Sequence, residues 1–205
     1  QAFVISDRAH LANLSLCLGS THAGKHFQLG SSIGLGGEAD PWQPIGTNSS
    51  MFQGKFNGAG FEISDLHATA THSGLFGYLG PTATIENLRL RGYAKGKIVG
   101  ALAGAAISGA LVSSVSTIVD VVIDGAGARS ATGGLIGMIG GSAEGSVVLS
   151  TIADIRIERE QGQGSIRGQG LFIGGVVGVA GLEADLAEPG TARAGYLNLV
   201  RTFVE

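Results

Sequence analysis

Gly74-Leu75-Phe76-Gly77 is the stretch that decides the fold, because looser copies of it follow along the chain. These copies are Gly-Ala-Leu-Ala-Gly at 100–104, Gly-Gly-Leu-Ile-Gly at 133–137 and Gly-Gly-Val-Val-Gly at 174–178. Self-similarity at a spacing of about twenty to fifty residues is typical of solenoids, propellers and other repeat arrays. The glycine boxes therefore predict a protein built from stacked copies of one short unit.

A second repeat accompanies the boxes, in the form apolar, any residue, Asp or Asn, apolar. It occurs at 63–66, 85–88, 118–121 and 152–155, with offsets of 22, 33 and 34 residues. Its longest match sets Ser-Thr-Ile-Val-Asp at 116–120 against Ser-Thr-Ile-Ala-Asp at 150–154. If this alignment gives the register of the fold, equivalent apolar residues form two interior stacks. The predicted stacks are Ile85 with Ile118 and Ile152, and Leu88 with Val121 and Ile155.

The repeat unit contains short strands, a glycine at each corner and no helix. In a parallel β-helix such glycines supply a positive φ or let two backbones approach closely. A propeller blade needs about forty residues, and the first two offsets are too short for that, so a propeller is the second choice. We therefore expect an all-β fold, a right-handed parallel β-helix, whose glycine-box repeats span residues 41–180.

The N-terminal part carries the one convincing helical pattern, at residues 6–18. Ser6 or Asp7 can cap its start, and Gly19 can end it. The apolar residues of its buried face are Leu11, Leu14 and Leu18. A helix in this position suits a cap that covers the open end of a stacked sheet.

The chain of 205 residues is expected to form a single domain. It begins at Gln1 without a methionine, and its strand-like end at 196–205 stops without a turn. We therefore expect it to be a piece of a larger protein, with flanking domains of the same chain as its neighbours.

Composition excludes several classes of function. The 36 glycines accompany a 44% hydrophobic fraction and 14% charged residues, which is enough apolar surface for a folded core. A net charge of −3 with scattered Lys and Arg gives no field for nucleic acid. No apolar run reaches about eighteen residues, so no membrane insertion is expected. Cys17 is the single cysteine, which excludes an internal disulfide.

Three segments together resemble the bacterial GLUG-motif family: Pro41-Trp42-Gln43-Pro44-Ile45-Gly46, Phe52-Gln53-Gly54-Lys55-Phe56-Asn57-Gly58-Ala59-Gly60-Phe61-Glu62-Ile63 and Gly74-Leu75-Phe76-Gly77. The resemblance implies an extracellular β-helix region of a large surface or secreted protein. Such proteins include filamentous-haemagglutinin-like adhesins, autotransporter-like passengers and the non-catalytic region of immunoglobulin A proteases. It therefore implies a secreted or bacterial cell-surface location. Family members usually carry an acidic pair after the first strand, whereas this chain has Ser31-Ser32 there.

The most suggestive polar feature is the column that the second repeat predicts: Asp65, Asn87, Asp120 and Asp154. Stacked carboxylates can bind calcium or act as acid and base in polysaccharide cleavage. A β-helix polysaccharide lyase or hydrolase using Asp120, Asp154 and Arg156 is thus the alternative function. We favour a structural column, because Asp and Asn bond to backbone groups at turns. No catalytic residue, cofactor or metal is expected.

Two isolated features have weak functional readings. His22 and His26 are separated by Gly24, which favours a loop over a metal-binding helix face. Trp42 is a possible sugar-stacking platform, but its sequence context favours packing at a turn.

Ligand contact is expected at two polar insertions, Glu158–Gln169 and Gly181–Gly195, because loops on a rigid scaffold collect function. The candidate ligand-binding residues are Glu158, Arg159, Gln161, Gln163, Glu183 and Asp185. A plain solvated loop is the competing interpretation. The sequence thus predicts a non-enzymatic extracellular adhesin or surface-display segment, a stiff stalk whose partner is a host-cell glycan or protein.

Overall fold

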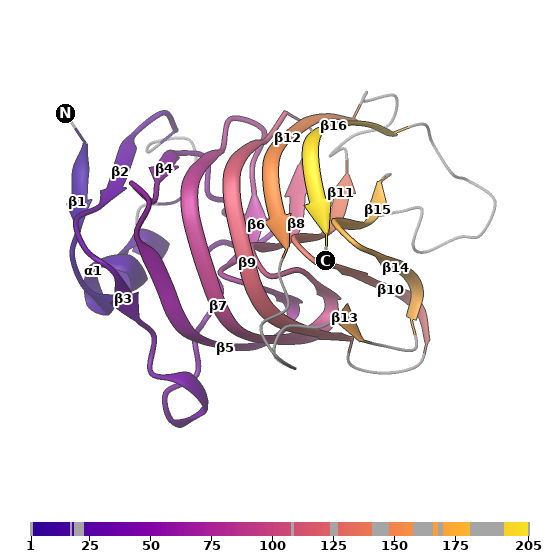
Figure 1. The fold of residues 1–205 in the computed structure, drawn as a ribbon, viewed down its shortest axis with the longest axis horizontal. Coiled ribbons are helices and arrows are strands. Elements are labelled where there is room, and N and C mark those ends of the chain that lie inside the picture. The colour runs from indigo at the N-terminus through magenta and orange to yellow at the C-terminus, as the bar shows by residue number, and fades with distance from the viewer. Residues whose placement is uncertain are drawn as a thin grey trace.

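The chain folds as a β-solenoid of about four turns made of parallel sheets, with one short helix near its N-terminus. This computed structural model describes residues 2–16, 18, 23–107, 109–123, 127–140, 148–157, 166–167, 170–180 and 195–204. Figure 1 shows the coils side by side, running from indigo at the N-terminal end to yellow at the C-terminal end. The prediction of an all-β parallel β-helix is therefore confirmed.

The larger sheet runs the length of the molecule in the strand order β1-β2-β4-β7-β9-β12-β16, with further strands attached beside this path. Each of its strand pairs is parallel, as a solenoid requires. Its strands are β1 (Phe3–Ile5), β2 (His26–Leu29), β3 (Ile33–Gly34), β4 (Lys55–Asn57), β5 (Glu62–Ser73), β7 (Thr84–Val99), β9 (Leu111–Ile123), β10 (Gly127–Gly133), β12 (Val148–Ile157), β13 (Ile166–Arg167), β14 (Gly170–Gly174) and β16 (Gly195–Val204).

A second, four-stranded sheet closes the coil behind the first, in the order β15-β11-β8-β6. It is built from the glycine boxes and the residues that follow them. Its strands are β6 (Phe76–Leu79), β8 (Ala103–Ile107), β11 (Ile136–Gly140) and β15 (Val177–Ala180). Phe76, Ala103, Ile136 and Val177 lie in one register, so the four boxes align as the sequence predicts.

One column of paired residues in the larger sheet links the coils. Backbone pairing aligns, in order, Phe3, Phe27, Phe56, Ile85, Val112, Ile152 and Leu199. Phe56 and Ile85 are fully buried in the core. Burial of large apolar side chains at about 25 cal/mol per Å² is the main stabilising contribution in such a coil.

The predicted stacks are wrong in their middle coil. Val112, and not Ile118, lies between Ile85 and Ile152. Ile118 pairs instead with Arg91. In the same way Val115, and not Val121, lies beside Leu88.

The predicted capping helix is present but shorter than residues 6–18. Helix α1 covers Arg8–Ala12 and continues as a 3-10 turn at Asn13–Leu16. The side chain of Asp7 accepts a hydrogen bond from the backbone N–H of His10 at 2.8 Å, which caps the helix start. Leu11 and Leu14 are buried in the main core, as predicted. Cys17 lies outside the described residues.

Candidate functional site

The four members of the predicted Asp and Asn column do not share one register. Asn87 lies opposite Ser114, since its neighbours Glu86 and Leu88 pair with Ser113 and Val115. In β12, Ala153 and Arg156 pair with Ser113 and Ser116, which places Asp154 in this same column.

Asp65 and Asp120 lie elsewhere. Asp65 occupies a separate corner, at the register shift between β5 and β7. Asp120 pairs with Tyr93, inside the strands beyond that corner. The column predicted from the sequence is therefore distributed over three positions.

Two of these positions are backbone corners. Asp65, Asn87 and Ser114 each have a φ of 53°, in the left-handed region that Asn and Asp tolerate better than most residues. The side-chain oxygen of Asn57 accepts hydrogen bonds from the N–H of Ala59 at 2.7 Å and from Asn87 Nδ2 at 3.3 Å. These contacts support a structural role for Asn87.

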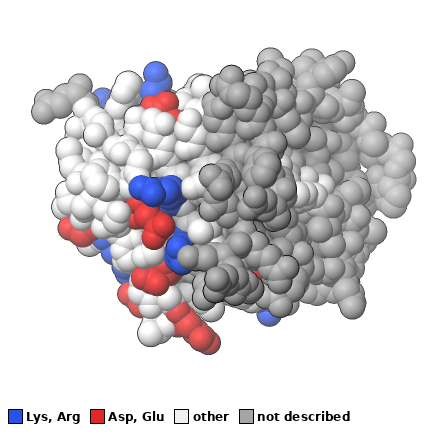
Figure 2. All heavy atoms as spheres, in the orientation of Figure 1, with Lys and Arg blue, Asp and Glu red and all other residues white. Residues whose placement is uncertain are grey.

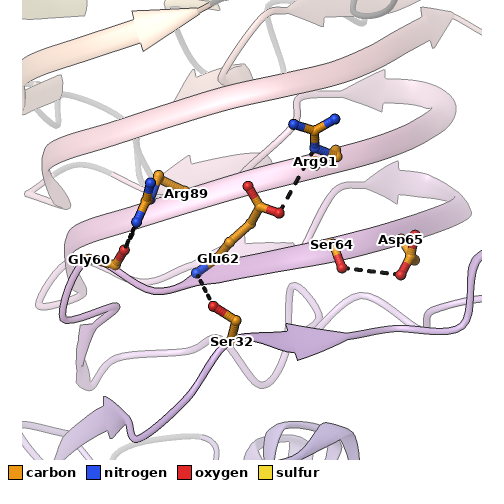
Figure 3. A network of polar contacts seen from close by, with 7 residues as sticks. All are labelled: Ser32, Gly60, Glu62, Ser64, Asp65, Arg89 and Arg91. Atoms are coloured by element: carbon orange, nitrogen blue, oxygen red, sulfur yellow. Dashed lines mark hydrogen bonds and ion pairs between the residues drawn. The ribbon is translucent and has the colours of Figure 1, made fainter.

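A polar network lies on the outward face of β3, β5 and β7, before the corner (Figure 3). The backbone N–H of Glu62 donates to Ser32 Oγ at 3.1 Å, and Glu62 Oε1 lies 3.9 Å from Arg91 Nε. Arg89 Nε donates to the carbonyl oxygen of Gly60 at 3.0 Å. The network links three successive coils and leaves its charges at the surface, where such contacts are weak.

The network gives this face a mixed charge. Figure 2 shows Lys and Arg atoms beside Asp and Glu atoms over the part of the face that is described. A mixed surface of this kind gives no single-sign field that would attract a charged partner.

Beyond the corner, the outward face has a different composition. His67, Tyr93 and Asp120 lie in register on β5, β7 and β9. The rings of His67 and Tyr93 are stacked, with centroids 4.9 Å apart and planes 26° from parallel. Lys95 and Lys97 follow Tyr93 on the same side of β7, since alternate strand residues point the same way.

The other suggestive aromatic groups have structural roles. Trp42 is 2% exposed and donates its Nε1–H to the carbonyl oxygen of Leu75 at 3.0 Å. The expectation that Trp42 packs at a turn is therefore confirmed. His72 Nε2 and Tyr78 Oη lie 2.9 Å apart at the join between the two sheets.

A concavity of about 340 Å³ lies at the N-terminal end of the coil. Its lining is mainly apolar, and Phe3 and Val4 in β1 are 57% and 60% exposed. The lining residues are Phe3, Val4, Ile5, His10, Asn13, Leu14 and Phe27. The sequence does not reveal this concavity, because β1 is only three residues long.

The predicted ligand-binding residues Glu158, Arg159, Gln161, Gln163, Glu183 and Asp185 all lie outside the described residues. His22 lies outside them as well, while His26 is an exposed residue of β2. In the described part of the chain, no three His, Cys, Asp or Glu side chains gather as a metal site would require. No described helix is long and apolar enough to span a bilayer.

The fold and these surfaces define the class of the protein, a parallel β-solenoid with polar outward faces. No family model matches the chain. A "putative Gly-rich membrane protein" of Evansella cellulosilytica is 38% identical over 97 residues, which cover 44% of this chain and 11% of that protein. The chain thus spans about a tenth of that relative's length.

Among solved structures, the chain is similar to a "putative immunoglobulin A1 protease" from Bacteroides ovatus, with a TM-score of 0.64. The likeness covers 97% of this chain and 64% of the other, at 15% sequence identity. At that identity the likeness concerns the fold alone.

Proposed function

We propose that this chain is a non-enzymatic stalk segment of a secreted or cell-surface bacterial protein, which displays its polar faces and loops. The observation that carries the proposal is the column of paired residues from Phe3 to Leu199, which keeps parallel register from β1 to β16. A coil with one continuous core is stiff along its axis, because each coil packs on its neighbours.

The comparisons support an extracellular location. The curated relative is named as a glycine-rich membrane protein, and the structural neighbour as an immunoglobulin A1 protease. The chain matches only part of each, at 11% and 64% of their lengths. A stalk within a longer surface protein accounts for both matches without assigning this chain the activity of either.

The lyase or hydrolase alternative loses its geometric support. Asp154 lies between residues that pair with Ser113 and Ser116, whereas Asp120 lies four residues further along β9 than Ser116. A catalytic carboxylate pair must flank one scissile bond at less than about 10 Å. Asp154 lies opposite Ser114, and Asp120 lies six strand positions beyond Ser114, which is roughly 20 Å. This separation is larger than the limit for a catalytic carboxylate pair.

The location can be tested on intact cells of the bacterium that encodes the chain. An antibody raised against the purified chain should label unpermeabilised cells or precipitate the protein from the culture medium. Labelling that needs permeabilised cells, with none of the protein in the medium, would contradict the proposal.

The adhesive role of the two insertions needs its own experiment. The insertion predicted at 158–169 contains the short strand β13 at Ile166–Arg167, which pairs with β9, so the deletions spare the strands. Beads coated with the chain, with a variant that lacks 158–165 or with a variant that lacks 181–194 are compared for attachment to host cells. Loss of attachment with either deletion supports an adhesin with ligand-binding loops. Unchanged attachment with both deletions limits the loops to a solvated spacer.

A further inference from the structure

We propose that the N-terminal end of the coil binds a second copy of this chain. The contact is antiparallel pairing of the two β1 strands, with Val4 on the two-fold axis. The inference goes beyond the stalk proposal and does not depend on it. It is carried by the free edge of β1, by the apolar surface around that edge and by the charges at its two ends.

Strand β1 is the open edge of the larger sheet. It pairs with β2 on one side, and no described strand pairs with its other side, at the left end of the coil in Figure 1. Ile5 accepts a hydrogen bond at 2.9 Å from the N–H of Gly30, just after β2. In a parallel pair, successive residues direct both of their backbone groups to opposite sides of the strand. Val4 therefore directs its N–H and its C=O outward, where they are open to another strand.

Antiparallel pairing about a two-fold axis matches this edge. When Val4 faces Val4 of the second copy, the two residues exchange both N–H···O bonds, as in the hydrogen-bonded pair of an antiparallel ladder. Phe3 then lies opposite Ile5 of the second copy, so all three residues of β1 take part. Self-complementary two-fold contacts are the commonest kind in soluble oligomers.

The surface beside the edge is apolar and uncovered. Phe3 and Val4 are 57% and 60% exposed, and Leu16, at the end of the 3-10 turn after α1, is 80% exposed. The ring of Phe3 is stacked on Phe27 with centroids 5.7 Å apart, which holds it in place. The concavity of about 340 Å³ is lined in part by Phe3 and Ile5. In the dimer, the Phe3 ring of the second copy lies opposite Ile5 and has this concavity to enter.

The capping helix limits the contact to this rim. Leu11 and Leu14 are buried in the main core, so α1 and the turn after it close the interior of the coil at this end. Arg8 fixes the cap, because its guanidinium lies 2.9 Å from Asp40 Oδ1 and 5.8 Å from the centre of the Trp42 ring. A three-residue strand with a short apolar rim buries less than the about 1,200 Å² of a standard interface. We therefore expect a weak dimer.

Charges at the two ends of β1 favour the antiparallel arrangement. Lys25 is exposed beside the start of β1 and has no ion-pair partner among the described residues. Asp7, two residues after the end of β1, caps α1 and lies 3.2 Å from His10 Nδ1, yet its side chain stays 55% exposed. Antiparallel pairing brings the start of one β1 beside the end of the other. Lys25 of each copy therefore approaches Asp7 of the other, which favours this orientation.

Sedimentation velocity of the purified chain tests the association. We expect a monomer–dimer equilibrium in which the dimer fraction rises between about 10 µM and about 1 mM. A chain that is still monomeric at about 1 mM would overturn the inference and leave the stalk and its location untouched. Species larger than a dimer would also overturn it, because an edge that binds a different surface of the next copy builds open chains.

A cysteine on the proposed axis locates the contact. In a Cys17→Ser background, Val4→Cys should give a disulfide-linked dimer under mild oxidation. Facing residues of a hydrogen-bonded antiparallel pair have Cα atoms about 5.5 Å apart, which is within disulfide range. Leu111→Cys is the matched control, since Leu111 is an exposed apolar residue of β9, away from this end. Equal or faster cross-linking of the control would contradict the proposal.

Substitutions of Val4 that do not form cross-links test the edge itself. Val4→Lys places like charges opposite each other and should weaken the dimer at least about tenfold. Val4→Pro removes the outward N–H but no bond to β2, and should weaken it by a similar factor. Val4→Thr keeps a β-branched side chain and should stay within about threefold. Circular dichroism should show the parent fold in all three variants, and unchanged dimerisation of folded Val4→Lys or Val4→Pro would overturn the inference.

Discussion

Two kinds of corner turn this coil, and they tolerate substitution very differently. The glycine boxes place Gly77, Gly104, Gly137 and Gly178 along one line of the second sheet. Gly46 precedes this line, because its neighbour Ile45 bridges to Phe76. A Cβ added at Gly77 would lie 2.4 Å from the carbonyl oxygen of Gly46, and one at Gly178 would lie 2.5 Å from that of Gly137. Only glycine fits where two backbones come this close.

The corner at Asn87 and Ser114, here called the polar corner, does not restrict the size of the side chain. Asn87 and Ser114 occupy it in successive coils with the same φ of 53°, and both side chains are exposed. The requirement here is a left-handed backbone, which several small polar residues meet. Close packing therefore specifies one residue type, whereas backbone conformation at an exposed corner specifies only a preference.

The largest expected effect is at the glycine corner. In Gly104→Ala, the new Cβ would lie 2.8 Å from backbone atoms of His72, so the two sheets must move apart. We expect a loss of about 3 kcal/mol or more in the free energy of unfolding, measured by urea denaturation.

Gly24→Ala is the matched control for that experiment. Gly24 has a φ of +73° and no atom within 4 Å of an added Cβ, so only its backbone conformation is affected. Its expected cost is about 1 kcal/mol. Equal losses in the two variants would show that close approach is not what the glycine boxes provide.

The polar corner should respond more weakly, and only to residues that resist a left-handed backbone. Asn87→Val places a β-branched residue at that φ and should cost about 2 kcal/mol. Asn87→Gly should stay within about 0.5 kcal/mol of the parent, because glycine adopts this conformation freely. Thermal unfolding of both variants checks the difference, and a larger loss for glycine than for valine would refute the conformational explanation.

Between the corners, Thr117 is an interior residue that is poorly matched to its place. Thr117 lies in register with Leu90, and its buried Oγ1 has no hydrogen-bond partner. Thr117→Val removes this unsatisfied hydroxyl and should raise stability by about 1 kcal/mol. A loss of stability in a urea titration would mean that the hydroxyl is satisfied in solution.

The smallest effect on stability is expected for the ion pair on the outward face of β5 and β7. Glu62 and Arg91 approach to 3.9 Å with side chains that are 34% and 38% exposed. A double-mutant cycle with Glu62→Gln and Arg91→Gln should give a coupling energy of at most about 0.5 kcal/mol. A coupling above 1 kcal/mol would show that the network of Figure 3 holds the coils together.

The difference between the corners explains what sequence analysis could predict. The glycine boxes identified the fold and aligned β6, β8, β11 and β15 correctly, because no other residue fits at the close approach. The strand register was wrong because Ser114 stands in the middle coil where Asn87 and Asp154 stand in the others. The Asp and Asn motif was therefore matched six residues too late, at Asp120.

A change in the alternation of inward and outward residues along β9 adds to this error. The left-handed corner at Ser114 shifts the alternation of the strand, so Val112 and Val115 both face the core. Ile118 consequently points outward, although its β-branched side chain suits an interior stack. An alternating pattern alone does not reveal where such a shift occurs.

The stacked ring pair on the outward face was less accessible to prediction than the fold. His67 and Tyr93 are 26 residues apart in the sequence, and only the backbone register places their rings together. The ligand-binding role of Glu158, Arg159, Gln161, Gln163, Glu183 and Asp185 remains a prediction, because these six residues lie outside the described residues.

The most direct test of the central claim, a parallel coil in the register described above, is disulfide cross-linking between β7 and β9. Arg89 pairs with Ser116 in the structure, whereas the sequence alignment pairs it with Val122. In a Cys17→Ser background, Arg89→Cys with Ser116→Cys should cross-link rapidly under mild oxidation. Arg89→Cys with Val122→Cys should not, because six strand positions span roughly 20 Å. Faster cross-linking of the Val122→Cys pair would contradict the register and, with it, the column of paired residues on which the stalk proposal rests.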